Sequence, residues 1–155
     1  MQGVGPVTPL SLRPAGLGLR LVAFVLDVLA LLSCLMALVT IGLFQLLLRT
    51  DGGQKDSEGA VWTAVALAVS WVAFVPLYHV LLWAWGGQTL GQRAVHIRVV
   101  REDGGSPGLW RAVVRYLVYV ISLIFLGMGF LPALWDERRR GLPDLISGTM
   151  VVDTL

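Results

Sequence analysis

Residues 17–48 read LGLRLVAFVLDVLALLSCLMALVTIGLFQLLL, an apolar stretch in which Arg20 and Asp27 are the only charged side chains. The stretch exceeds the roughly 20 residues that an α-helix needs to cross a bilayer. A carboxylate at that depth costs about 2.5–3.5 kcal/mol unless another group satisfies it. Because Arg20 and Asp27 are seven residues apart, two helical turns place them on one face, roughly 10 Å apart along the axis. The stretch therefore predicts a membrane-spanning helix over Leu19–Leu48 with a polar site in its interior.

The composition also indicates a membrane protein. Of the 155 residues, 56% are hydrophobic and 14% are charged, whereas soluble domains have about 25% charged residues. We expect an irregular tail over residues 1–16 and one membrane domain over residues 17–153. The first apolar run is too long for the core of a cleavable signal peptide, so we expect it to remain as a helix. With Cys34 as its single cysteine and no Cys/His cluster, the chain is expected to hold no metal or other cofactor.

A second apolar stretch predicts a second membrane span over Val61–Trp85. Pro76 lies within this span and is expected to bend it. Trp62 near its start, and Trp83 and Trp85 near its end, are typical of the aromatic belts at the two membrane interfaces. Residues 49–60 are polar, and we expect them to form the loop that joins the two spans.

After the second span the pattern of the sequence changes. Thr89 is expected to cap a short helical turn over Leu90–Arg93. Apolar and polar residues then alternate over Ala94–Val100, which predicts a β-strand. Thr149–Val152 is a second short segment rich in β-branched residues. Because an isolated strand would leave its backbone groups unsatisfied, we predict that the two segments pair into a small sheet.

A third apolar segment, Val118–Leu134, follows an amphipathic helical entry over Trp110–Tyr119. The segment is short, and Gly127, Gly129 and Pro132 interrupt it. A complete third span and a broken or re-entrant element are both open alternatives, and the glycines favour the second. We therefore predict an all-α membrane protein with two long transmembrane helices, a broken or re-entrant third hydrophobic segment and a small cytoplasmic strand pair.

The arginines set the expected orientation, because cytoplasmic loops carry an excess of Lys and Arg. Residues 86–117 contain five arginines and the C-terminal tail contains three. We therefore expect a multi-pass protein of the bacterial plasma membrane, with both termini in the cytoplasm and the loop over residues 49–60 outside. Arg138, Arg139 and Arg140 are expected to rest on anionic lipid head groups.

Three motifs occur in order along the chain. The first is Arg20-x-x-Ala23-x-x-x-Asp27. The second begins as Gly87-x-Thr89-Leu90-Gly91-x-Arg93 and continues through Ile97-x-Val99-Val100, Asp103-Gly104-Gly105 and Arg115. The third is Arg140-Gly141-Leu142-Pro143-Asp144-Leu145-Ile146-Ser147-Gly148-Thr149-x-Val151-Val152. Together they resemble the signatures of the RDD family of small bacterial integral membrane proteins, over about residues 13–153.

The RDD family takes its name from one arginine and two aspartates, which the resemblance places at Arg20, Asp27 and Asp144. Pro143 stands where many members have a polar or histidine residue, so the resemblance gives no role to this position. The biochemistry of the family is mostly undefined, although transport-related and accessory roles have been proposed for members. The resemblance therefore implies the class of protein and leaves its activity open.

We expect a polar cluster near the cytoplasmic interface, because a buried charge is retained when it is paired. Its candidate members are Arg20, Asp27 and Asp144, completed by His79 or by an arginine such as Arg93 or Arg115. Three roles are open for Asp27: a hydrogen-bonded clip between helices, a proton or cation relay, and a ligand site. Asp144 either caps the turn that follows it or pairs with an arginine.

No nucleophile beside a base and no metal-binding spacing occur in the sequence, so we do not expect an enzyme. Two functions fit the remaining features: an accessory or scaffolding membrane protein, and a small oligomeric ion or solute transporter that uses Asp27. Two spans and a broken third are few for a complete translocation path in one protomer, which favours the first. The expected partners are the lipid bilayer and either another membrane protein or a second copy of the chain. Nucleic acid is not expected.

Overall fold

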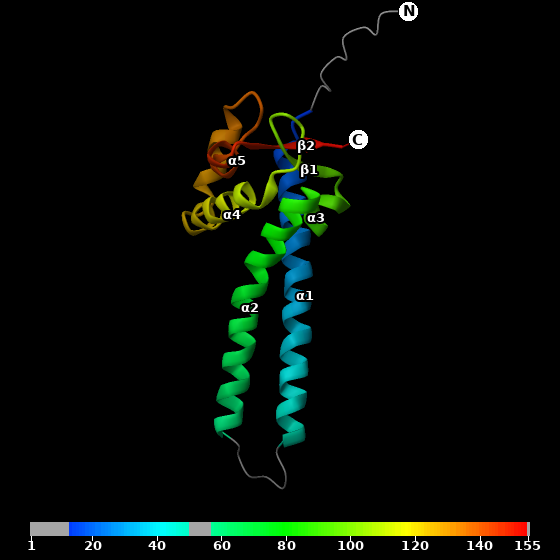
Figure 1. Ribbon diagram of the computed structural model, residues 1–155, viewed down its shortest axis with the longest axis vertical. Coiled ribbons are helices and arrows are strands. Elements are labelled where there is room, and N and C mark those ends of the chain that lie inside the picture. Colours follow the sequence, from blue (N-terminus) through cyan, green and yellow to red (C-terminus); the bar gives the residue numbers. More distant parts are fainter. Residues whose placement is uncertain (1–12, 50–56, 155) are drawn as a thin grey trace, which may run out of the picture.

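The computed structural model describes residues 13–49 and 57–154. Two long helices, α1 (Leu17–Arg49) and α2 (Ser57–Gly86), run side by side, and the other described elements gather where α1 begins and α2 ends (Figure 1). We call residues 13–27 and 78–154 the head, and residues 28–49 and 57–77 the hairpin.

Both long helices are apolar along most of their length. The mean hydropathy is 2.7 over residues 17–48 and 2.0 over residues 58–86, so each is long and apolar enough to cross a membrane. This confirms the two long apolar helices predicted from the sequence. Pro76 lies inside α2 without ending it. Residues 50–56 of the predicted polar loop lie outside the described residues.

Short elements make up the rest of the head. In chain order they are α3 (Leu90–Ala94), β1 (Ile97–Arg101), α4 (Gly108–Ile124), the 3-10 helix η1 (Met128–Leu134), α5 (Leu142–Ser147) and β2 (Thr149–Asp153). The predicted cap is confirmed, because the Thr89 hydroxyl accepts a hydrogen bond from the Gln92 N–H while the Gln92 side chain accepts one from the Thr89 N–H. This reciprocal pair of hydrogen bonds caps the start of α3.

The two strands form an antiparallel pair in which Val99 lies opposite Val151. The strand pair is therefore confirmed, but β1 begins at Ile97 rather than Ala94. His96 adopts a φ of 57°, a left-handed turn that separates α3 from the strand. Residues 13–16, which we predict as part of an irregular tail, run along the other edge of β2, where the Ala15 N–H donates to the Val151 carbonyl at 2.9 Å.

The third hydrophobic segment is broken, as the glycines predict. The axes of α4 and η1 differ by 104°, and α4 lies crosswise to the two long helices (Figure 1). Gly127 takes a φ of 80° at the bend, a conformation that favours glycine. At Gly129 an added Cβ would lie 1.9 Å from the Ser122 Oγ, so the return of the chain against α4 also requires glycine.

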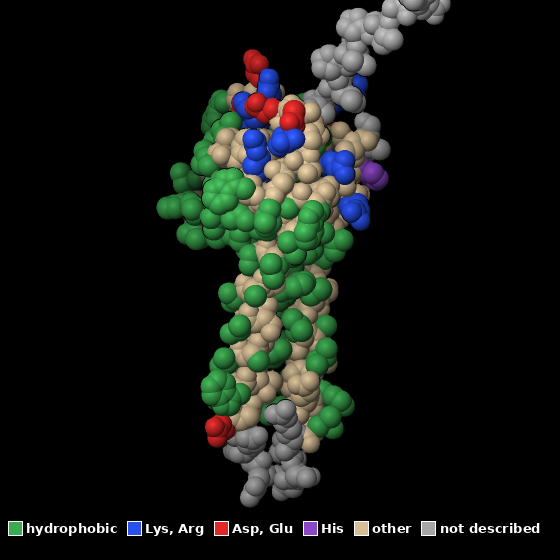
Figure 2. Space-filling model, in the orientation of Figure 1, with side chains coloured by type: hydrophobic (Ala, Val, Ile, Leu, Met, Phe, Trp, Pro, Cys, Tyr) green, Lys and Arg blue, Asp and Glu red, His purple; other side chains and the backbone are tan. Residues whose placement is uncertain are grey.

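The core of the protein lies in the head. Ile97, Val99 and Ala112 are fully buried there, and Trp83 is only 2% exposed. Of the tryptophans that we predict at the membrane interfaces, Trp83 packs inside the core and donates from Nε1 to Gln92, whereas Trp62 and Trp85 are 65% and 78% exposed. Their place at the interfaces stays a prediction. In the hairpin most apolar side chains are exposed. Figure 2 shows them covering the hairpin and the flank of the head near α4, whereas the charged side chains gather at the outer end of the head.

Candidate functional site

Asp144 lies in the first turn of α5 and binds two arginines from other helices. Arg20 of α1 places its Nη1 2.8 Å from Asp144 Oδ2, and Arg115 of α4 donates from Nη1 to Oδ1. The exposed fractions of the side chains are 15% for Arg20, 6% for Arg115 and 3% for Asp144. Asp144 also accepts the Gly141 N–H at 3.1 Å. The carboxylate therefore caps its own helix and holds α1, α4 and α5 together.

Arg115 has further partners on both sides of its guanidinium. It donates to the Thr149 hydroxyl at the start of β2 at 2.8 Å. Its Cζ atom lies 5.0 Å from the centre of the Trp83 ring, within the range of a cation–π contact. The polar cluster of Arg20, Arg115 and Asp144 therefore connects α5 and β2 to Trp83, near the end of α2.

The surroundings of Asp144 stabilise its ionised form. Burial by itself opposes ionisation of the carboxyl group, but the positive charges of Arg115 and Arg20 and the hydrogen bonds from Arg115 and the Gly141 N–H outweigh it. The pKa of Asp144 is consequently lowered from its ordinary value. At neutral pH the group is a carboxylate shared by two guanidinium groups.

Asp27 forms a separate site at the junction of α1, α2 and α3. Its Oδ1 accepts the Tyr78 hydroxyl at 2.6 Å and the Gly91 N–H at 2.8 Å, and its Oδ2 accepts the Thr89 hydroxyl at 2.5 Å. Asp27 is 5% exposed. Asp27 therefore binds the start of α3, the end of a helix at which a carboxylate is favourable. Its partners are neutral groups rather than an arginine.

The contact between α1 and α3 depends on Gly91. A Cβ atom added there would lie 2.1 Å from the Ala23 carbonyl oxygen and 2.9 Å from the Asp27 carboxyl carbon. Glycine thus lets the backbone of α3 approach α1 closely enough for its N–H to reach Asp27. Ala23 itself is 2% exposed, so small residues face each other across this contact.

Two residues that we predict as candidates do not pair with either aspartate. His79 is buried, but its Nδ1–H donates to the Val75 carbonyl of its own helix at 3.0 Å. Its ring packs among aromatic side chains, with ring centres 5.3 Å from Trp83 and 5.7 Å from Tyr116. Arg93 is exposed on α3. Of the candidates from residues 93–115, it is Arg115 that meets Asp144.

The three consecutive arginines have different surroundings. Arg140 binds Asp136 through Nε at 3.0 Å and Glu102 through Nη1 at 3.2 Å. Hydrogen bonds from Arg140, first from its side chain and then from its backbone, lower the pKa of Asp136 to about 2. Arg138 lies 3.7 Å from Glu102 and is exposed. The head-group contact that we expect for Arg138, Arg139 and Arg140 stays a prediction.

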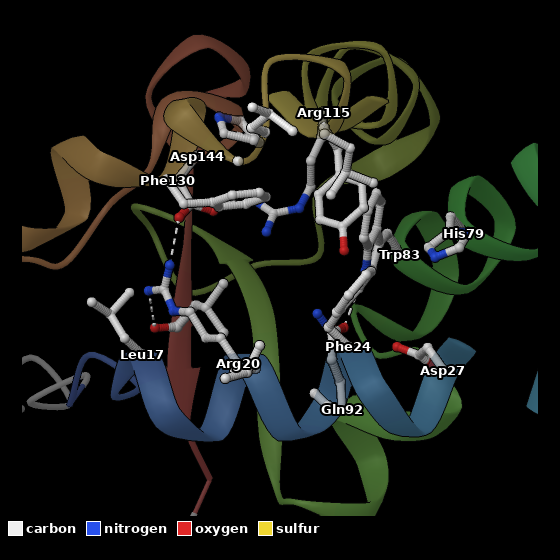
Figure 3. Close-up of a pocket in the computed structure, with 18 residues that line it drawn as sticks. Leu17, Arg20, Phe24, Asp27, His79, Trp83, Gln92, Arg115, Phe130 and Asp144 are labelled. Carbon is white, nitrogen blue, oxygen red and sulfur yellow. Dashed lines mark hydrogen bonds and ion pairs between the residues drawn. The ribbon is translucent and has the colours of Figure 1, made fainter. Parts of the chain in front are cut away.

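The two carboxylate sites face a common cavity of about 360 Å³ (Figure 3). Arg20 and Phe24 reach it from α1, while Arg115, Phe130 and Asp144 approach it from the opposite side. Among residues 13–49 and 57–154, no group of three or more His, Cys, Asp and Glu side chains is placed to hold a metal ion. The chemistry available at this site is therefore that of guanidinium groups and carboxylates beside aromatic and aliphatic walls.

Sequence reasoning missed two of the three donors to Asp27. Tyr78 is recognisable as a polar residue within the second apolar stretch, whereas Thr89 was assigned only to the start of a short helix and Gly91 only to the second motif. The signal for them was the order of the motif, Gly87-x-Thr89-Leu90-Gly91, because a hydroxyl and a glycine at the start of a helix offer donors to a carboxylate. Trp83 was missed because tryptophan near a helix end is also typical of membrane interfaces.

Comparison with known proteins adds the family. The model of the RDD family matches residues 14–148. A "Proline-rich antigen" of Mycobacterium leprae is 30% identical over 95 residues, which cover 57% of this chain and 38% of the relative. A "Proline-rich antigen homolog" of Mycobacterium tuberculosis is 35% identical over 91 residues, covering 54% and 38%. "Uncharacterized protein YxaI" of Bacillus subtilis is 36% identical over 77 residues, covering 49% and 50%.

The matched part of the chain thus spans about two fifths of the length of the mycobacterial relatives. No solved structure shows significant similarity to this chain. The family match covers both aspartates and both arginines of the two sites described above. The chain belongs to the RDD family.

Proposed function

We propose that this protein is an accessory membrane protein, in which the paired charges hold a compact head at the membrane surface and the hairpin presents an apolar surface to lipid and to a membrane partner. The observation that carries the proposal is the closed pairing of Asp27. Its two oxygens accept three hydrogen bonds from neutral groups, and the side chain is 5% exposed. A carboxylate held in this way supports a structural clip rather than a relay.

The sequence of the hairpin supports the same function. No charged residue and no histidine occurs between Val28 and Leu48 or between Gly59 and Leu77. A proton or cation that reached Asp27 would therefore find no Asp, Glu, His, Lys or Arg side chain along these two stretches of one protomer. The oligomeric transporter is the alternative that this arrangement favours less.

The proposed membrane placement rests on the arginines. All the Lys and Arg residues except Arg49 and Lys55 fall within the head as defined above. The beginning and end of the described chain meet there, because the Asp153 N–H donates to the Arg13 carbonyl at 2.9 Å. A head in the cytoplasm and a hairpin that crosses the plasma membrane twice satisfy the positive-inside rule.

Site-specific photo-crosslinking in living cells tests the accessory role. A photoreactive amino acid at Val72, which is 73% exposed in the hairpin, is expected to give one discrete protein adduct. The matched position is Asp103, which is 61% exposed on the head and is expected to give no such adduct. Lipid adducts alone at Val72, with no protein adduct, would contradict an accessory role in the membrane.

A further inference from the structure

The cavity between the two carboxylate sites has the size of a ligand site. Its volume of about 360 Å³ falls within the roughly 300–1,000 Å³ typical of small-molecule pockets. Its walls come from every described element of the head except β1, and most of the lining residues lie on α1, α2, α4 and α5. The structural roles described above belong to the polar groups that line the cavity. They give no role to the empty space itself.

One end of the cavity carries a local surplus of positive charge. There Arg20 and Arg115 share the single carboxylate of Asp144, so these three groups together have a net charge of one positive unit. Asp27 adds a formal negative charge elsewhere in the lining, where its oxygens are already occupied by neutral donors. Within the described part of the chain, the buried Nε atoms of Arg20 and Arg115 have no hydrogen-bond partner. Buried donors without a partner are unfavourable, and an anionic oxygen would supply one after a small turn of the guanidinium groups.

The other walls of the cavity are apolar and lead outward to lipid-facing side chains. Phe24, Leu123 and Phe130 line it, and Leu21 and Leu126 form exposed parts of its lining, with exposed fractions of 63% and 96%. Leu126 also has a φ of 52°, a left-handed conformation that leucine seldom adopts. The bend between α4 and η1 therefore holds a fully exposed apolar side chain at the edge of a cavity that also contains two arginines.

We propose that this cavity holds the phosphate head group of an anionic membrane phospholipid. Guanidinium groups match the geometry of phosphate oxygens and keep their charge at every physiological pH. The acyl chains would leave the cavity over Leu21 and Leu126, into the layer where the exposed apolar residues lie. A free phosphate ion would gain nothing from this apolar mouth. The inference uses the membrane placement proposed above, but it does not depend on an accessory partner.

Thermal unfolding of the full chain in neutral maltoside micelles tests the lipid site separately from any partner. The added compounds are dihexanoylphosphatidylglycerol, dihexanoylphosphatidylcholine and inorganic phosphate. We expect the anionic lipid alone to raise the unfolding midpoint, by roughly 5–10 °C at about a hundredfold excess over its dissociation constant. An equal rise with phosphatidylcholine would overturn the role of charge. An equal rise with inorganic phosphate would overturn the lipid as the occupant.

Matched variants locate the effect in the cavity. Leu126→Asp places a negative charge at the mouth and should abolish the rise, whereas the neutral Leu126→Asn should retain most of it. Leu123→Trp fills the space and should also abolish the rise, whereas Val72→Trp, on the exposed surface of the hairpin, should leave it unchanged. The double variant Arg138→Gln/Arg139→Gln should keep the rise as well. Loss of the rise in that variant, or its survival in Leu126→Asp and Leu123→Trp, would overturn the cavity as the site.

Discussion

Two isoleucines, one in the head and one in the hairpin, have opposite surroundings. In the head Ile97 is fully buried, whereas in the hairpin Ile41 is 55% exposed. Charges divide in the same way, because Arg20, Arg115 and Asp144 pair inside the head and no charged residue occurs in the hairpin between Val28 and Leu48. The head thus obtains its stability from contacts within the chain. The hairpin leaves most of its apolar side chains exposed, and in the membrane placement that we propose lipid or another protein would cover them.

The largest expected effect comes from removing the shared carboxylate of the head. Asp144→Asn would leave Arg20 and Arg115 buried side by side without their counter-charge, and it should lower the free energy of unfolding by about 3–5 kcal/mol. Chemical unfolding in mixed micelles measures this loss. The control is Asp103→Asn, which breaks an exposed pair with Arg101 and should cost about 0–1 kcal/mol. Equal losses in the two variants would show that the Asp144 cluster is not a structural clip.

A matched truncation in each region tests the comparison itself. Ile97→Ala should cost about 2–5 kcal/mol, because it leaves a cavity in the packed core of the head. Ile41→Ala removes the same atoms from an exposed position of the hairpin. We expect it to have little effect on unfolding in micelles, where detergent replaces the lost contact. A similar loss at both positions would mean that the hairpin packs within the protein as tightly as the head.

The contact between α1 and α3 should be sensitive to a single methyl group. Gly91→Ala would bring a Cβ to 2.1 Å from the Ala23 carbonyl oxygen, so α3 would have to move away from Asp27. Overpacking of this kind costs about 1–3 kcal/mol. Gly18→Ala is the control, since nothing lies within 4 Å of a Cβ at that position and alanine is the better helix former. If Gly91→Ala were as stable as Gly18→Ala, the close approach of α3 would not be required.

Acid should weaken the head by a smaller, graded effect. The pKa of Asp144 lies below the ordinary 3.8 because of Arg115 and Arg20, and that of Asp136 lies at about 2. A group with a lowered folded-state pKa stabilises the protein above its unfolded-state pKa, and this contribution is lost as the pH falls through the folded value. The midpoint temperature of thermal unfolding should therefore decrease as the pH falls below about 4. The drop should be shallower in Asp144→Asn, and parallel curves for the two proteins would contradict the assignment.

The sequence predicts the parts of the fold that depend on local pattern. Hydropathy indicates α1 and α2, alternation indicates the strand pair, and glycines indicate the break near Gly127. It does not predict which side chain of α2 meets Asp27. His79 and Tyr78 lie at nearly the same depth, but neighbouring residues on a helix point about 100° apart. Both side chains therefore lie near the level of Asp27 along the helix axis. Only Tyr78 points toward Asp27, whereas His79 bonds to the Val75 carbonyl of its own helix.

The partners of the charged residues also depended on tertiary structure. Arg93 and Arg115 lie in the same arginine-rich part of the sequence, and both were candidates for the polar cluster. Arg93 lies on the exposed side of the short helix α3, whereas α4 crosses the head and brings Arg115 to Asp144. The bend at Gly127 and the return through η1 bring α5, with Asp144, back against α4, and no local pattern of residues gives the direction of that return.

Proton flux in liposomes tests the central claim that Asp27 is a structural clip. Wild-type protein and Asp27→Asn would be reconstituted and compared with empty liposomes under a pH gradient. We expect that wild-type liposomes keep the gradient as long as empty ones, and that Asp27→Asn loses about 1–3 kcal/mol of stability through weaker hydrogen bonds to Tyr78, Thr89 and Gly91. Rapid loss of the gradient with the wild type, abolished in an Asp27→Asn protein of unchanged stability, would contradict the clip and establish a relay.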